Sequence, residues 1–229
     1  MAASQFVDNF RTAANPQIVK KLAAGDLMGS KRLLLASTKY SYYMMFIICF
    51  PVCLLAHPLL KIWLGVVPDY TVIFLQIIVI QSLFQVFDTS FYTALYAKGR
   101  LRENALISPT LGFISFPIIY FLFKAGYSPV ALSWASLLTY AVLGLIVVKI
   151  ANYYWRDVWN VFKPCLLVTM AALPVPVFLY HIIGVDSIPH SIFIGFITVI
   201  IIILSVYWIG IDVLTKQKVW SYIKRRVKK

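Results

Sequence analysis

Acidic residues are scarce in this sequence, and charged residues of any kind are few. The 229 residues include 8 Asp and Glu against 21 Lys and Arg, and charged residues make up 13% of the chain. An average soluble domain carries about 25% charged residues. Hydrophobic residues reach 61%, which excludes an ordinary soluble domain and a disordered chain. The predicted fold class is therefore all-α integral membrane.

Cysteines and catalytic motifs are also sparse. The three cysteines, Cys49, Cys53 and Cys165, lie in apolar stretches without further Cys or His ligands at metal-binding spacing. We interpret them as small buried hydrophobic residues. The chain lacks P-loop, HExxH, GxSxG and GxGxxG motifs, and no nucleophile lies beside a base. These absences predict a protein that is no enzyme and uses no metal and no cofactor. No apolar core precedes the first charged cluster, which argues against a cleavable signal peptide.

Positive charge is the one kind of charge present in excess. The formal net charge is +13, a value that could indicate nucleic-acid binding. The basic residues, however, form short clusters between long apolar stretches, which is the usual distribution of loop charges in membrane proteins. The predicted partner is therefore the lipid bilayer, and no nucleic acid.

Six apolar segments are long enough to cross a bilayer. A helix needs about 20 predominantly apolar residues to span the hydrocarbon core, and a helix satisfies its own backbone hydrogen bonds there. The predicted spans cover approximately residues 40–60, 70–97, 105–123, 128–151, 162–183 and 190–212. Residues 1–39 are predicted to be the end of a preceding helix plus a basic cytoplasmic loop, and 213–229 a basic cytoplasmic tail. An exposed N-terminal arm is the alternative for residues 1–19, and Pro16 is expected to end or kink any helix there.

The connections between these segments alternate in charge. Leaving out Arg11, eighteen Lys and Arg lie before the first segment, on every second connection and in the tail, and only Lys61 and Lys124 lie on the other connections. Positive residues are retained on the cytoplasmic side of membrane proteins. The pattern predicts a multi-pass protein with both N- and C-termini in the cytoplasm.

The second segment carries an unusual polar stripe. Gln81, Gln85, Asp88 and Tyr92 are separated by four, three and four residues, so they share one helix face. Asp88 lies about 14 Å from the segment's end at 1.5 Å per residue, which is near mid-bilayer, where an ionisable residue is costly. The stripe is interpreted as the lining of a translocation cavity. Polar contact between packed helices is the alternative.

Short motifs in the connections resemble a known family. They are Pro16-Gln17-Ile18-Val19-Lys20, Ala24-Gly25-Asp26, Ile62-Trp63-Leu64-Gly65 with Pro68-Asp69-Tyr70, and Ala97-Lys98-Gly99-Arg100. Their order resembles polysaccharide biosynthesis proteins of the O-antigen flippase type, in the multidrug, oligosaccharidyl-lipid and polysaccharide exporter superfamily. The resemblance covers essentially the whole chain and points to the C-terminal half of such a protein.

The resemblance implies a function and a partner. Proteins of this type have two MATE-like helical lobes around a central cavity and move undecaprenyl-pyrophosphate-linked oligosaccharides across the bacterial inner membrane for surface polysaccharide or lipopolysaccharide synthesis. By this resemblance the chain is a six-helix lobe that needs a missing N-terminal lobe or partner chain. Arg11 is the one base within reach of the cavity, so it is the predicted contact to the pyrophosphate. A six-span scaffold or partner subunit, and a membrane-embedded glycan or lipid enzyme, are the competing interpretations.

Overall fold

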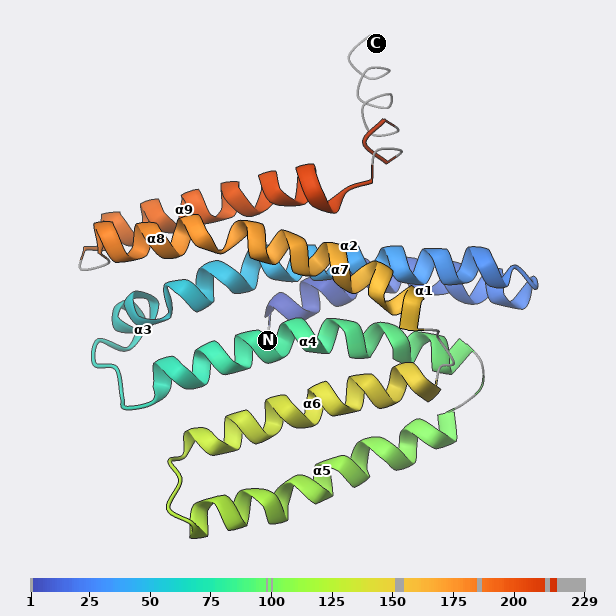
Figure 1. Ribbon diagram of the computed structural model, residues 1–229, viewed down its shortest axis with the longest axis horizontal. Helices are drawn as coiled ribbons and strands as arrows, with labels where there is room; N and C mark the ends of the chain where they lie inside the picture. Colours follow the sequence, from blue (N-terminus) through green and yellow to red (C-terminus); the bar gives the residue numbers. More distant parts are fainter. Residues whose placement is uncertain are drawn as a thin grey trace.

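The computed structural model describes residues 2–97, 99, 101–150, 155–184, 187–212 and 215–217. All regular secondary structure in these ranges is helical, which confirms the all-α prediction. Most of the helices lie side by side, and the connections alternate between the two ends of the molecule (Figure 1). The elements are α1 (Ala2–Ala23), α2 (Leu27–Leu54), α3 (Ala56–Leu64), α4 (Thr71–Ala97), α5 (Leu101–Lys124), α6 (Val130–Ile150), α7 (Trp155–Ala172), α8 (Pro174–Ile183), α9 (Ile188–Ser205) and the π-helical η1 (Val206–Gly210).

Several helical segments are apolar and long enough to cross a membrane. Among the described residues these are Leu27–Leu54, Asp157–Ile183 and Ile188–Gly210. Shorter apolar stretches occupy Thr71–Phe87, Gly112–Lys124 and Val130–Val142. Length and composition of this kind indicate a membrane protein. The six predicted ranges are thus helical over most of their length, and crossing by all six stays a prediction.

The first 39 residues follow the sequence prediction in part, since α1 lies where the end of a helix was predicted. The predicted basic loop up to residue 39 is largely helical, because α2 begins at Leu27 and packs antiparallel against α1. Pro16 lies inside α1 and does not end it. The two helices stabilise each other: Ile18 is 2% exposed, and Ser30 Oγ donates a 2.9 Å hydrogen bond to the Ile18 carbonyl. Packing of this kind commonly stabilises helices more than local propensity does.

The turn between α1 and α2 is held by one acidic side chain. Asp26 Oδ1 accepts a 2.8 Å hydrogen bond from the Gly29 N–H, and Oδ2 accepts a 3.0 Å bond from Lys21 Nζ. These two bonds, the Lys21 bond foremost, lower the pKa of Asp26. Because the folded-state pKa is lowered, the cap stabilises the turn near neutral pH, and that stabilisation is lost as the pH falls through the lowered pKa.

Two of the predicted spans are interrupted near prolines. The fifth range consists of α7 and α8, which meet at Leu173 just before Pro174. Pro174 and Pro176 have no N–H to donate to the preceding turn, so the regular hydrogen bonding is interrupted there, although Leu173 keeps a helical backbone. In the first range, α2 ends at Leu54, one turn after Pro51, and α3 continues the chain. Each range was predicted as a single span, and proline within a membrane helix often marks such a kink.

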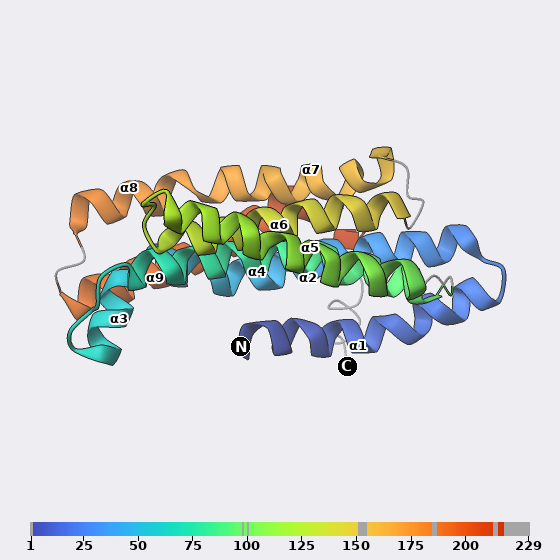
Figure 2. The same cartoon turned by 90° about the horizontal axis from the view of Figure 1, so that it is seen from below.

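The core is centred on α2. Phe46 is 1% exposed and stacks between Tyr42 and Phe50, with ring centroids 6.0 and 5.4 Å away. Buried residues from α1, α4, α7 and α9 complete this cluster. Cys49 and Cys165 belong to it, which confirms the interpretation of those two thiols as buried hydrophobic groups, whereas Cys53 is half-buried. Figure 2 shows α1 on one face of the bundle and α7 with α8 on the opposite face.

Ion pairs and a hydrogen bond connect α2 to α7 and to the segment around η1. Lys31 pairs with Asp157 at the start of α7, and Lys39 Nζ donates to Asp212 Oδ2 at 3.0 Å, just after η1. Tyr43 Oη also donates a 3.3 Å bond to the Gly210 carbonyl. These contacts hold the start of α7 and the segment after η1 against α2.

Candidate functional site

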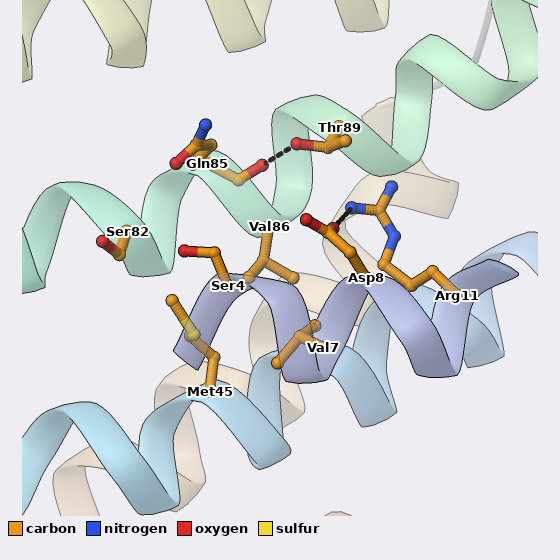
Figure 3. Close-up of a pocket in the computed structure, with 9 residues that line it drawn as sticks. All are labelled: Ser4, Val7, Asp8, Arg11, Met45, Ser82, Gln85, Val86 and Thr89. Carbon is orange, nitrogen blue, oxygen red and sulfur yellow. Dashed lines mark hydrogen bonds and ion pairs between the residues drawn. The ribbon is translucent and has the colours of Figure 1, made fainter. Parts of the chain in front are cut away.

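A small polar pocket lies between α1, α2 and α4. Its volume is about 100 Å³, which is room enough for water. It is lined from α1 by Ser4, Val7, Asp8 and Arg11, from α2 by Met45, and from α4 by Ser82, Gln85, Val86 and Thr89 (Figure 3). The pocket therefore depends on the packing of three helices.

The floor of the pocket is apolar. Val7 is 2% exposed, Met45 is 2% exposed and Val86 is 5% exposed. All three belong to the main core cluster, so the pocket opens directly from the core of the bundle. A floor of this kind limits water and strengthens electrostatic interactions with the polar groups above it.

Among the described residues that line the pocket, Arg11 is the only cation. It is 5% exposed, and its Nη1 lies 3.6 Å from Asp8 Oδ1, one helical turn away. In Figure 3 the Arg11 side chain extends from α1 toward α4 beside Thr89. A guanidinium carries five donors in a planar fork, which suits carboxylate or phosphate oxygens. The site can therefore hold an anionic group.

On the α4 side, the pocket is lined by two hydroxyl oxygens that can accept hydrogen bonds and by the side-chain amide of Gln85. Ser82 Oγ donates to the Ile78 carbonyl at 2.9 Å, and Thr89 Oγ1 donates to the Gln85 carbonyl at 2.7 Å. Their hydrogens are used within α4, so their oxygen lone pairs remain for other donors. The exposed Gln85 amide can both donate and accept. These groups suit hydroxyl-bearing ligands.

Two of the residues predicted from the sequence meet in this pocket. Arg11 and Gln85 both line it, although they are 74 positions apart in the chain. Gln81 and Tyr92 are half-buried on α4 and do not line it. The side chain of Asp88 lies outside the part of the chain whose side chains are described, so its predicted role stays a prediction.

Sequence reasoning missed the contribution of α1. Ser4 and Asp8 line the pocket together with Arg11, whereas the sequence suggested only Arg11. The three-residue spacing of Asp8 and Arg11 is the signal that could have found this pair, because such residues are neighbours on a helix. The sequence alone also allowed an exposed arm for residues 1–19. An arm has no fixed helix face, so the spacing of the pair could not be interpreted as a contact.

Comparison with family models, curated proteins and solved structures finds no match to this chain. The site is therefore interpreted from its own residues. Among the described residues, no group of three or more His, Cys, Asp or Glu side chains is arranged to hold a metal ion.

Proposed function

We propose that the chain is one lobe of a membrane transporter that moves an undecaprenyl-pyrophosphate-linked oligosaccharide across the bacterial inner membrane for surface polysaccharide synthesis. It acts there as the C-terminal, MATE-like lobe and works with a second lobe or partner chain. The observation that carries this proposal is the polar pocket with the buried Arg11, because its floor belongs to the apolar core cluster of the bundle. Polar and charged groups at such positions mark substrate paths in membrane proteins.

The chemistry of the pocket matches the two polar parts of this substrate. Arg11 would bind the pyrophosphate through two parallel N–H bonds, and Gln85 with the neighbouring hydroxyl groups would bind sugar hydroxyls. The lipid chain can stay in the bilayer while the polar head passes the pocket. A second lobe closes the other side of the path and allows alternating access by movement of one lobe against the other.

Cysteine scanning along α4 tests whether the polar stripe faces water. In a background without the three native cysteines and with the second lobe supplied, a cysteine introduced at position 81, 85, 88 or 92 is expected to react with a water-soluble, membrane-impermeant thiol reagent. Cysteines that replace Ile77 and Leu95 are expected to stay protected, because those positions on α4 are 3% and 0% exposed in the bundle and lie outside the pocket.

The matched control is Phe84, whose side chain is 41% exposed but apolar. It neighbours Gln85 in sequence and points about 100° away from it on the helix, so a lipid-facing cysteine introduced at position 84 should not react. If positions 81 and 85 react no faster than position 84, the stripe is a contact between helices. The alternative of a six-span scaffold or partner subunit without transport activity is then favoured.

Reporter fusions test the proposed six crossings and orientation. Cytoplasmic signals are expected from fusions after Lys31, Arg100, Arg156 and Lys229, and external signals after Pro68, Gly126 and Asp186. The physical reason is the alternation of basic residues between connections. Two or more reversed fusions would exclude the six-span arrangement with both termini in the cytoplasm.

A further inference from the structure

We infer that Asp8 is a built-in competitor for Arg11, which holds the guanidinium when no substrate is bound and weakens the binding of the anionic group that replaces it. This inference rests on the proposed function, from which it takes a pyrophosphate as the anion. Asp8 then sets the affinity of the site for the anion. Asp8 acts through Arg11 and is therefore a positioning residue.

The geometry of the pair is that of a loose contact. Arg11 Nη1 and Asp8 Oδ1 are 3.6 Å apart and lie one turn apart on α1. Charge-assisted hydrogen bonds between such groups measure about 2.7–2.9 Å. The 3.6 Å contact is thus an electrostatic attraction longer than a direct hydrogen bond. A pyrophosphate can accept two parallel N–H bonds from one guanidinium. It therefore binds Arg11 more strongly than the Asp8 carboxylate does across 3.6 Å.

Burial differs sharply between the two partners. The Arg11 side chain is 6% exposed, whereas the Asp8 side chain is 59% exposed. A buried cation is costly without a negative partner, but a largely hydrated carboxylate gives up its ion pair at small cost. A substrate anion can therefore take the place of the Asp8 carboxylate beside Arg11, and Asp8 is then fully hydrated.

The displaced carboxylate stays close to the bound anion. Asp8 and Arg11 line the same pocket and are carried on the same helix (Figure 3), so Asp8 repels an anion that sits on Arg11. A transport site has to bind its substrate and also release it. The Asp8 carboxylate favours release, because its attraction to Arg11 is regained when the anion leaves.

The test is a titration of inorganic pyrophosphate into the full chain in lipid nanodiscs, followed by calorimetry in magnesium-free buffer. Asp8→Asn is expected to tighten binding about fivefold, the effect of removing one exposed ion-pair partner. Asp26→Asn is the matched control. It makes the same charge change in the α1–α2 turn, where Asp26 pairs with Lys21, and asparagine is an equally good helix cap. Its affinity is expected to equal that of the unmodified chain.

A second pair of variants tests whether the effect passes through Arg11. In an Arg11→Gln background, adding Asp8→Asn should leave the affinity unchanged. The inference is overturned if the unmodified chain binds no pyrophosphate, if Asp8→Asn does not tighten binding, or if the tightening persists without Arg11. If Asp8→Asn does tighten binding but the chain with its second lobe moves no lipid-linked oligosaccharide, the proposed function fails and the role of Asp8 stands.

Discussion

Replacing Arg11 with glutamine is expected to lower transport of the lipid-linked oligosaccharide about a hundredfold when the second lobe is supplied. Two charge-assisted hydrogen bonds from one guanidinium to pyrophosphate contribute about 3 kcal/mol together, which corresponds to a factor of about one hundred. Arg11→Lys keeps the charge but loses the planar fork, so it should retain an intermediate rate. The measurement is the amount of surface polysaccharide in cells that lack their own flippase.

Arg32→Gln is the matched control for this experiment. Arg32 is an exposed residue on α2, outside the pocket, and its replacement removes the same charge. Transport is expected to stay within about twofold of the unmodified chain, since surface charges away from a site usually have small effects. Membrane levels of each variant are measured by immunoblot. Equal transport by Arg11→Gln and Arg32→Gln, at equal protein levels, would contradict a substrate role for Arg11.

Truncating Phe46 to alanine is expected to lower the free energy of unfolding by about 3 kcal/mol, the lower part of the range for Phe→Ala in protein cores. Phe46 is 1% exposed and stacks on two rings at the centre of the bundle, so its removal leaves a cavity. The lower part of the range applies because lipid chains also surround apolar side chains of separated helices. Unfolding in bicelles or a thermal melt in detergent measures the change.

Phe116→Ala provides the comparison for Phe46→Ala. Phe116 lies on α5 and is 68% exposed, so the same atoms are removed without opening a cavity. Its effect on unfolding is expected to stay within about 0.5 kcal/mol. If both variants unfold at the same temperature, the aromatic cluster around Phe46 is not the centre of stability.

The helices were predictable from the sequence, but several of their ends were not. The apolar runs at 70–97, 105–123 and 128–151 correspond closely to α4, α5 and α6, because hydrophobic residues make up most of each helix. The start of α2 at Leu27 was missed, since Lys31, Arg32 and Lys39 interrupt the apolar residues there. Those residues are helical because α1 packs against them and Asp26 caps the first turn. The interruption at Leu173 could be suspected from Pro174 and Pro176, but hydrophobicity does not change there and so does not divide the span into two helices.

The candidate site was predictable in part, because helical periodicity can be read from one segment. Gln81, Gln85, Asp88 and Tyr92 share a face by helical periodicity alone, and that regularity is local. The approach of Arg11 and Asp8 to Gln85 is a contact between α1 and α4, and nothing in the spacing along either segment determines which helices become neighbours.

Composition and local pattern thus specified a helical, apolar chain with its basic residues on alternate connections. These properties depend on each segment separately: its length and hydrophobicity suit a helix in lipid, and its flanking charges set its orientation. Tertiary packing decided that Pro16 stays inside a helix, that Lys39 reaches Asp212, and that Arg11 of α1 lies against the polar face of α4. These outcomes depend on which side chains fit together across helices distant in sequence, and only the folded arrangement specifies that fit.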